Sequence, residues 1–280
     1  MSNVPRAFVI GHPIGHSRSP LIHGHWLTLH GLAGSYDKIP VAPEDLDGFV
    51  RGLKAAGFAG GNVTVPHKER VLDLADETDE AARAIGAANT LWFEDGRLVT
   101  GNTDVTGFLA NLDEEAPGWD RAGGSAVVIG AGGAARAVIH GLLERGFEVG
   151  VANRTLIRGV ELAEAYEEGV WAYSWEELPQ LVRTADLVVN TTSLGMEGQP
   201  PLDLNLDGLK RNAVVADIVY SPLETTLLRD ARARGLRTVG GLGMLLHQAV
   251  PGFERWFGVR PEVTPKLRAL VEADLRAPRS

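Results

Sequence analysis

The stretch AVVIGAGGAARAVIHGLLERGFEVGVANRT, residues 126–155, decides the fold. An apolar run at 126–129 precedes a glycine-rich loop, and a helical pattern followed by a second apolar run comes after the loop. The loop matches GxGxxA: Gly130 makes a tight turn, Gly132 lets the backbone approach a pyrophosphate, and Ala135 allows close packing of helix on strand. Because the loop joins a strand to a helix start, where backbone amides bind anions, a dinucleotide-binding unit is favoured over a turn that only packs.

The end of the second strand discriminates between the two nicotinamide dinucleotides. An NAD enzyme usually carries an acidic residue here for the ribose 2′-hydroxyl, whereas an arginine accommodates a 2′-phosphate. No acidic residue occurs from Val149 to Arg158, and Asn153, Arg154 and Thr155 complete a plausible clamp with Arg158. Two solvated arginines at a helix start are the alternative interpretation, but their placement favours NADP as the cofactor.

The rest of the chain alternates short apolar runs with helical patterns, which is typical of an α/β fold. Further strands expected at 186–190, 213–219 and 236–239 predict a doubly wound, Rossmann-like parallel sheet of five or six strands. In the first half we expect strands at 7–10, 36–41 and 62–65, each followed by a helix, at 20–30, 44–55 and 67–75, and then a hairpin turned by Asp95-Gly96.

An acidic stretch rich in proline and glycine, residues 113–124, separates the two halves. We therefore expect two α/β domains, residues 1–105 for the substrate and 106–244 for NADP, with a helical segment from Met244 onward. The length of 280 residues suits two domains that each bury a core.

Composition excludes several classes of function. The chain has no cysteine, so disulfides, thiolate metal sites and cysteine nucleophiles are absent. Its formal charge of −9 argues against a nucleic-acid or anionic membrane surface. The first ten residues have no signal-peptide pattern, and no apolar run approaches the length of a membrane span, so we expect a cytoplasmic protein whose partner is a small molecule.

Two serines in GHPIGHSRSPL, residues 11–21, can form a neutral donor pair for a carboxylate. Ser19 precedes a proline, which is a signal for a helix start, so Ser19 can instead simply cap that helix. The local sequence leaves both interpretations open for Ser17 and Ser19. Five histidines lie nearby, but they lack the spacing of a metal motif and have few acidic neighbours, so no metal site is expected.

The stretch GGNVTVPHK, residues 60–68, places a lysine directly after a strand. If Pro66 opens a helix, Lys68 lies in its first turn, where the helix dipole disfavours a cation. A local rule broken in this way often marks function, although an ordinary surface lysine is the alternative. Asp104, in GNTD at 101–104, is the natural carboxylate partner for an acid–base lysine, although Asn102 to Asp104 can also be a helix cap.

Taken together, these segments resemble the shikimate dehydrogenase family. The family's signatures occur in order over most of the chain: GHPIGHSRSP at 11–20, GGNVTVPHK at 60–68, GAANT at 86–90, GNTD at 101–104, GAGGAARA at 130–137, NRT at 153–155, NTTSLGM at 190–196, DIVYSP at 217–222 and GLGMLLHQA at 241–249. The resemblance implies NADPH-dependent reduction of 3-dehydroshikimate to shikimate, on the route to chorismate and the aromatic amino acids. It also implies a possible homodimer.

The resemblance assigns roles residue by residue. It implies that Lys68 and Asp104 are the catalytic pair. The substrate residues it implies are Ser17, Ser19 and Tyr220 for the carboxylate, and Asn62, Thr64, Asn89, Asp104 and Gln248 for the ring hydroxyls. The cofactor residues it implies are Gly130, Ala131, Gly132, Gly133, Ala134, Ala135, Asn153, Arg154, Thr155, Arg158, Thr191, Met196, Ile218, Gly241 and Met244. In the family the last helices, here about 245–280, return to the first domain, and the site lies in a cleft between the domains.

One departure from the family pattern is visible, because His23 is followed by Gly24 where many members have asparagine. We expect only a packing effect. Three other functions stay open: a broader quinate/shikimate dehydrogenase, a non-catalytic NADP-binding regulator on the same fold, and, for the histidine cluster, a metal-dependent hydrolase. The intact Lys68 and Asp104 argue against the regulator.

Overall fold

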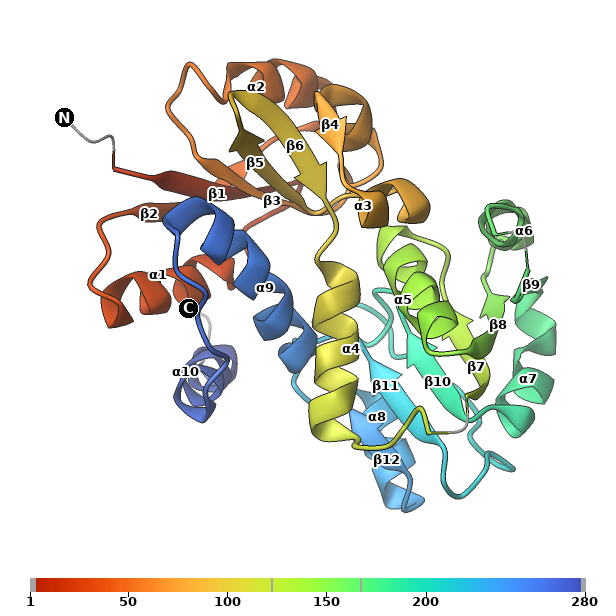
Figure 1. The fold of residues 1–280 in the computed structure, drawn as a ribbon. Helices are drawn as coiled ribbons and strands as arrows, with labels where there is room; N and C mark the ends of the chain where they lie inside the picture. The colour runs from red at the N-terminus through yellow and green to blue at the C-terminus, as the bar shows by residue number, and fades with distance from the viewer. Residues whose placement is uncertain (1–3, 122, 167, 278–280) are drawn as a thin grey trace. The chain divides into compact units, whose positions relative to one another are not determined.

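The computed structural model describes residues 4–121, 123–166 and 168–277, and the chain divides into two compact units (Figure 1). The first unit comprises Met1–Asp104 and Leu246–Ser280, and the second comprises Val105–Leu245. The chain passes between the units within two helices, α4 (Asp104–Glu115) and α9 (Gly241–Phe257). Within the described ranges, no helix combines the length and the apolar character that a membrane crossing requires.

The first unit contains a mixed six-stranded sheet of order β2-β1-β3-β5-β6-β4. Its strands are β1 (Arg6–Gly11), β2 (Ser35–Pro40), β3 (Gly60–Val63), β4 (Glu77–Thr78), β5 (Thr90–Glu94) and β6 (Arg97–Gly101). Strand β1 pairs in parallel with β2 and β3, whereas β5 is antiparallel to both β3 and β6. The predicted hairpin is confirmed, since Asp95 and Gly96 join β5 to β6 with φ of 50° and 80°, as a type I′ turn requires. The two-residue β4 was not predicted.

Successive residues of β1 face opposite sides of this sheet, and both sides are buried. Phe8 and Ile10 belong to one apolar cluster, and Ala7 and Val9 to another that includes Trp256 of α9. The helical segments of the unit, besides α9, are α1 (Ser19–Leu29), η1 (Pro43–Asp45), α2 (Leu46–Gly52), η2 (Arg70–Leu74), α3 (Glu80–Ile85) and α10 (Pro265–Arg276). Burial on both sides explains why the β1 sequence is continuously apolar.

The prediction of a helix at 67–75 is wrong for the first half of that range. The chain forms a hydrogen-bonded turn from Thr64 O to His67 N–H, 3.0 Å, and only the short 3₁₀-helix η2 follows. His67 is buried, and its Nε2 lies 2.8 Å from the carbonyl oxygen of Val41. This tertiary contact, which local sequence cannot reveal, holds the chain in a turn. Lys68 therefore lies on a loop, and the predicted conflict with a helix dipole does not arise.

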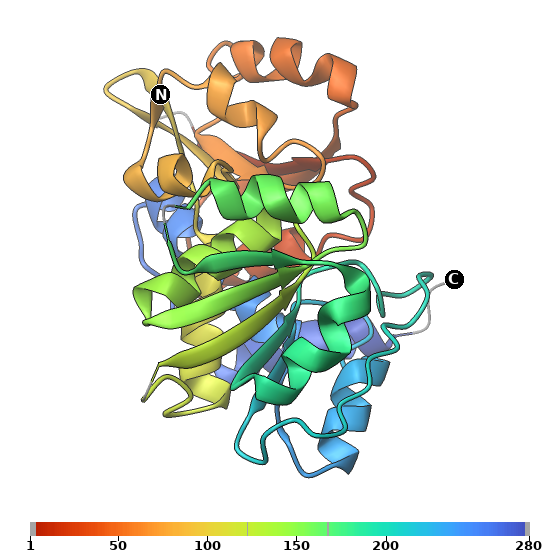
Figure 2. The same cartoon turned by 90° about the vertical axis from the view of Figure 1, so that its right-hand side faces the viewer.

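The second unit contains a parallel six-stranded sheet of order β12-β11-β10-β7-β8-β9. Its strands are β7 (Gly124–Ile129), β8 (Phe147–Ala152), β9 (Val170–Tyr173), β10 (Leu187–Asn190), β11 (Val214–Asp217) and β12 (Arg237–Val239). Renumbered from β7, the order is that of the doubly wound dinucleotide-binding fold, so the predicted fold class is confirmed. Strand β9, seen at the near edge in Figure 2, was not predicted.

Helices cover both faces of this sheet. The helices that lie wholly within the unit are α5 (Gly133–Glu144), α6 (Leu156–Glu164), α7 (Leu178–Thr184) and α8 (Thr226–Ala233), with the 3₁₀-helix η3 (Trp175–Glu177). Buried residues of α4, α5 and α6 share one cluster with Val128, and those of α7 and α8 share the other with Val127. The alternation of adjacent β7 residues between two cores is what a sheet covered on both sides requires.

Residues 113–124 do not separate the two halves, so that expectation is wrong. The division falls after Asp104, and the stretch packs within the second unit. Trp119 stacks on Phe147 with ring centroids 5.3 Å apart, and Arg145 forms ion pairs with Asp113, at 2.7 Å, and Asp120. Two of the acidic residues in the stretch are thus paired with an arginine at the end of α5.

Candidate functional site

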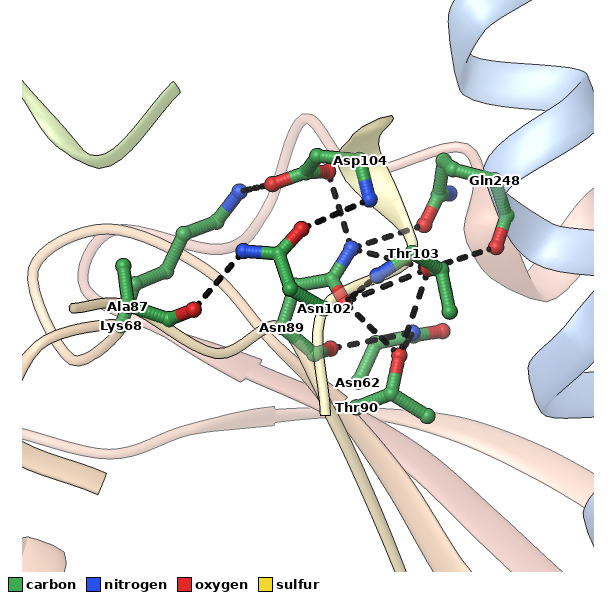
Figure 3. Close-up of polar contacts among 9 residues, drawn as sticks. All are labelled: Asn62, Lys68, Ala87, Asn89, Thr90, Asn102, Thr103, Asp104 and Gln248. Atoms are coloured by element: carbon green, nitrogen blue, oxygen red, sulfur yellow. Dashed lines mark hydrogen bonds and ion pairs between the residues drawn. The ribbon is translucent and has the colours of Figure 1, made fainter. Parts of the chain in front are cut away.

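A buried polar cluster lies in the first unit where β3, β5 and β6 meet α9 and the start of α4 (Figure 3). Asn62 lies in β3, Asn89 directly precedes β5, Thr103 and Asp104 follow β6, and Gln248 lies in α9. All five are buried, with 9% of the residue surface or less exposed. Such a group of polar side chains, connected by hydrogen bonds inside a core, rigidifies the site it forms.

Lys68 and Asp104 form an ion pair at one end of this cluster. The ammonium of Lys68 contacts Oδ2 of Asp104, and the side chains are only 14% and 7% exposed. The main chain fixes the lysine loop, because the Ala88 N–H donates to the Lys68 carbonyl at 2.7 Å. The structure therefore brings together the two residues that the sequence suggested as partners, in surroundings where solvent screens their attraction weakly.

Neutral groups hold Asp104 on its other sides. Its Oδ1 accepts a hydrogen bond from Asn89 Nδ2 at 2.8 Å. Its backbone N–H donates to Asn102 Oδ1 at 2.9 Å, and Asn102 Nδ2 donates to the Ala87 carbonyl at 2.8 Å. Asn102 thus caps the start of α4, while the Asp104 side chain remains directed at Lys68. The capping interpretation applies to Asn102 and not to Asp104.

Asn89 connects the pair to α9. Its Nδ2 lies 3.0 Å from Thr103 Oγ1 and 3.4 Å from Gln248 Oε1, and its Oδ1 accepts from the Thr103 N–H at 2.8 Å. Thr103 Oγ1 in turn donates to the Gln248 carbonyl at 2.8 Å. Helix α9 is therefore hydrogen-bonded to the residues that flank β5 and β6, next to Asp104.

Tyr36 is a functional candidate that sequence reasoning missed. Its hydroxyl donates to Asn62 Oδ1 at 2.6 Å, while Asn62 Nδ2 donates to the Asn89 carbonyl at 3.1 Å. Burial raises the pKa of the Tyr36 hydroxyl well above its ordinary value, and the Ser19 hydroxyl acts in the opposite direction. Tyr36 is the buried residue of β2, between half-buried Ser35 and exposed Asp37, and a lone aromatic residue among polar ones at the start of a predicted strand was the signal that could have found it.

The two serines lie together at the start of α1. Ser17 Oγ accepts from the Ser19 N–H at 3.3 Å and lies 3.3 Å from Ser19 Oγ. Helix α1 begins at Ser19, and Arg18 occupies the N-cap position without a side-chain capping bond. The interpretation that Ser19 merely caps the helix is therefore wrong. Thr64 is half-buried one residue after β3, with its methyl group against Gly11.

The histidines do not form a metal centre. Among the described residues, no group of three or more histidine and acidic side chains is arranged to hold an ion. His23 is fully buried, with its ring stacked on Tyr36 at a centroid distance of 3.9 Å. Burial lowers its pKa to about 3, against a smaller opposing effect of the Asn62 side chain, so the imidazole is neutral.

The glycine-rich loop of the second unit leaves room for an anion at the start of α5. Gly130 has φ of 111°, and an added Cβ there would lie 2.8 Å from Thr191 Oγ1, so only glycine fits. Gly132 is the N-cap of α5 and makes no side-chain capping bond, and an added Cβ there would meet nothing within 4 Å. The first amides of α5 have no carbonyl partner within the helix, so a pyrophosphate can accept hydrogen bonds from them. Ala135, fully buried, packs against the sheet.

The predicted 2′-phosphate clamp lies on the loop after β8. Asn153 Nδ2 donates to the Thr155 carbonyl at 2.8 Å, and α6 begins one residue later. Arg154 and Arg158 are exposed, and neither forms an ion pair within the described part of the chain. Two arginines with this freedom at a helix start suit a phosphate dianion.

The other predicted cofactor residues lie at the carboxyl ends of neighbouring strands and at the start of α9. Thr191 Oγ1 donates to the Ile129 carbonyl at 2.7 Å, and the Ile218 N–H donates to the Asn190 carbonyl at 3.1 Å. At Gly241 an added Cβ would lie 2.1 Å from the Ile218 carbonyl oxygen. The remaining predicted residues of the second unit are Ala131, Gly133, Ala134, Met196, Tyr220 and Met244. Tyr220 therefore belongs to a different unit from the two serines.

Comparisons with known proteins agree along the chain. Three family models match: the shikimate dehydrogenase substrate binding domain at residues 9–91, shikimate/quinate 5-dehydrogenase at 116–196, and the shikimate 5′-dehydrogenase C-terminal domain at 241–270. A protein of Methylocella silvestris named shikimate dehydrogenase (NADP(+)) is 58% identical, covering 97% of each chain. One of the same name from Methylobacterium radiotolerans is 60% identical, covering 97% of this chain and 98% of its own.

Solved structures resemble the chain along nearly its whole length. The shikimate dehydrogenase of Thermus thermophilus, in complex with NADP(H) and shikimate, superposes with a TM-score of 0.85 at 38% identity, covering 97% of this chain and 98% of its own. The quinate dehydrogenase of Corynebacterium glutamicum, in complex with NAD, has a TM-score of 0.89 at 32% identity, covering 96% and 99%.

Proposed function

The chain belongs to the shikimate dehydrogenase family, and on that premise we propose that Lys68 and Asp104 carry out the acid–base step of its NADP-dependent reaction. The reaction is the reversible reduction of 3-dehydroshikimate to shikimate. One observation carries the assignment of the two residues: they form a buried ion pair, and the neutral side chains of Asn89 and Asn102 hold Asp104 on its other sides.

The cofactor suits the second unit. The open amides of α5 are proposed to hold the pyrophosphate, and Arg154 with Arg158 the 2′-phosphate. The segments that carry Thr191 and Ile218, at the ends of β10 and β11, complete the proposed site together with the start of α9. Bound NADP supplies the hydride acceptor, and NADPH the hydride donor. We accordingly assign residues 106–244 to the cofactor and residues 1–105, with about 245–280, to the substrate.

The lysine and the aspartate divide the acid–base work. In the direction of reduction, negative charge grows on the ketone oxygen of the substrate, and the Lys68 ammonium stabilises it and donates a proton from Nζ. Asp104 accepts from Nζ and orients the lysine, while Asn89 fixes the carboxylate through Oδ1. In the direction of oxidation, the same pair accepts the proton of the substrate hydroxyl.

The serine pair is the proposed site for the substrate carboxylate. Two hydroxyl donors side by side, next to the start of a helix, bind an anion without a full positive charge. Tyr220 is proposed to add a third hydroxyl. Asn62, Thr64, Asn89 and Gln248, which share or border the buried cluster with Asp104, are proposed to select the ring hydroxyls.

A steady-state assay tests the function. Formation of the reduced cofactor, NADPH or NADH, is followed by its absorbance with shikimate or quinate, and with NADP or NAD, in all four combinations. The proposal predicts that shikimate with NADP gives the highest kcat/KM. A broader quinate/shikimate dehydrogenase, which the fold likeness to the quinate enzyme favours, would oxidise quinate with comparable efficiency. NADP binding without any shikimate oxidation would overturn the proposal.

The assembly and the location belong to the same proposal. Family resemblance supports a homodimer that acts in the cytoplasm. Sedimentation equilibrium would then give twice the chain mass of 30.0 kDa, and fractionation would recover the protein with cytoplasmic markers. A monomer over micromolar concentrations, or recovery elsewhere, would contradict it.

A further inference from the structure

Two buried polar side chains face each other at the carboxyl ends of β10 and β11. Asn190 and Asp217 are paired in the register of these parallel strands, and they are 0% and 2% exposed. Asn190 Nδ2 donates to Asp217 Oδ1 at 2.9 Å. Polar groups at this depth are retained only when hydrogen bonds satisfy them, so their partners show what they hold in place.

The partners of Asn190 lie in the loop that follows β10. Its Oδ1 accepts from the Thr192 N–H at 3.0 Å and from Thr192 Oγ1 at 2.7 Å. Its Nδ2 also donates to the Leu194 carbonyl at 3.0 Å. One asparagine side chain thereby fixes the first half of the segment 191–196.

The partners of Asp217 lie in the segment that follows β11. Its Oδ1 accepts from the Val219 N–H at 3.0 Å, which fixes the backbone between Ile218 and Tyr220. Its Oδ2 accepts from Thr225 Oγ1 at 2.7 Å, and Thr225 is the N-cap of α8. All three groups that reach the carboxylate are hydrogen-bond donors, which suits an ionised acid better than an amide.

Both segments border the glycine-rich loop or the strand ends beside it. Thr191 Oγ1 contacts the Ile129 carbonyl directly before Gly130, and the two segments are also joined to each other, because the Glu197 N–H donates to the Ser221 carbonyl at 2.8 Å. Doubly wound sheets bind their ligands at the carboxyl ends of the strands. The pair therefore lies directly beneath backbone that surrounds the proposed cofactor site.

Burying the Asp217 carboxylate at this position costs free energy, and packing alone does not explain why an acid occurs here. Within the described residues it forms no ion pair, and burial raises its pKa to about 6 despite its three hydrogen bonds. An apolar or amide residue would fill the same space without that penalty. A carboxylate whose burial costs free energy, next to ligand-binding loops, therefore serves to hold those loops in one conformation.

We propose that Asn190 and Asp217 are positioning residues for NADP, holding segments 191–196 and 218–220 in the conformation that receives the cofactor. The inference rests on the proposed NADP site of the second unit. Neither side chain has to touch the cofactor: each fixes backbone whose own atoms and neighbouring side chains do. Residues that hold the binding groups of a site in place determine how tightly the ligand binds.

The test measures NADP binding by isothermal titration calorimetry with the full chain in the absence of shikimate. Asp217→Ala and Asn190→Ala are each expected to raise the Kd for NADP about tenfold, the size of one or two lost hydrogen bonds to each segment. Asp217→Asn keeps the shape and is expected to rescue part of the loss. Asp186→Asn is the matched control, because Asp186 lies at the opposite end of β10 and binds Ser125 and Lys210.

A second measurement separates positioning from general damage. Hydrogen exchange of the cofactor-free protein is expected to rise in 191–196 and 218–220 in the two alanine variants, but not in β7 or α5. If Asp217→Ala does not fold, Thr192→Val carries the test, because it removes the hydroxyl bonds to Asn190 Oδ1 and to the Leu194 N–H, with an expected rise in Kd of about threefold. Folded variants that bind NADP within twofold of the wild type would overturn the inference. A wild-type chain that does not bind NADP would instead overturn the proposed function.

Discussion

Two buried aspartates, one in each unit, each accept a hydrogen bond from an asparagine amide but differ in whether a cation is beside them. Asp104 accepts from the side chain of Asn89, and Asp217 accepts from the side chain of Asn190. Asp217 is the last residue of β11, and Asp104 lies three residues after the end of β6. Asp104 also meets an ammonium group, whereas Asp217 meets only neutral donors.

The difference shows how one side chain serves two purposes. A carboxylate paired with a lysine keeps the ammonium charged and directed, so the pair can stabilise developing charge and move a proton. A carboxylate among neutral donors organises the backbone that supplies them. The ion pair thus indicates acid–base chemistry in the first unit. The acid without an ion pair indicates a positioning role in the second unit.

Removing the ammonium gives the largest expected effect. Lys68→Ala should lower kcat by about 10²- to 10⁴-fold with little change in KM for shikimate, because a positioned acid–base group acts on the transition state. Steady-state rates at saturating NADP measure this effect. Lys54→Ala is the control, since its ammonium only binds the Gly96 carbonyl. A kcat within threefold of the wild type would remove Lys68 from the mechanism.

The unpaired acid predicts a pH dependence of stability. Burial raises the pKa of Asp217 from 3.8 to about 6, so between these values the folded protein holds a proton that the unfolded chain has released. The free energy of unfolding contributed by this group therefore falls as pH rises, by about 2 kcal/mol from pH 4.5 to 7.

Asp217→Asn should remove that dependence. Urea unfolding of both proteins at pH 4.5 and 7 gives the difference, in which the opposite contribution of His23, whose pKa is lowered to about 3, cancels. The variant should gain stability relative to the wild type at pH 7 compared with pH 4.5. An unchanged difference between the two pH values would show that Asp217 is not a buried, uncompensated acid.

The serine pair predicts a smaller, substrate-specific effect. Ser17→Ala should raise KM for shikimate about tenfold, because it removes a hydrogen bond to a charged carboxylate, and should change kcat much less. Ser35→Ala is the control, since its hydroxyl lies 3.3 Å from Asp37 in β2. If KM stays at the wild-type value, the carboxylate binds elsewhere.

The exposed arginine predicts the smallest effect. Arg154→Leu should reduce the preference for NADPH over NADH by about fivefold, the size of an exposed charge contact. Arg229→Leu, which removes an exposed arginine of α8, is the control. Selectivity that survives the change at Arg154 would place the 2′-phosphate on other residues.

The sequence predicted what depends on local pattern. The glycine loop and the hairpin at Asp95-Gly96 follow from backbone conformations that few residues allow, and the parallel sheet follows from the alternation of apolar runs with helical patterns. It failed where a distant contact decides the local structure. The turn before Lys68 depends on His67 reaching Val41, and the role of Asp217 depends on donors from two loops. Neither partner can be identified from spacing along the chain.

The rate of NADPH formation in a single turnover, with enzyme saturated by both shikimate and NADP, tests the contrast between the two aspartates most directly. Lys68→Ala is predicted to slow this step at least 100-fold, because the loss is chemical and saturation cannot restore it. Asp217→Ala is predicted to slow it less than tenfold, with its main defect in the Kd for NADP. Equal slowing in both variants under saturation, or the reverse order, would contradict the account.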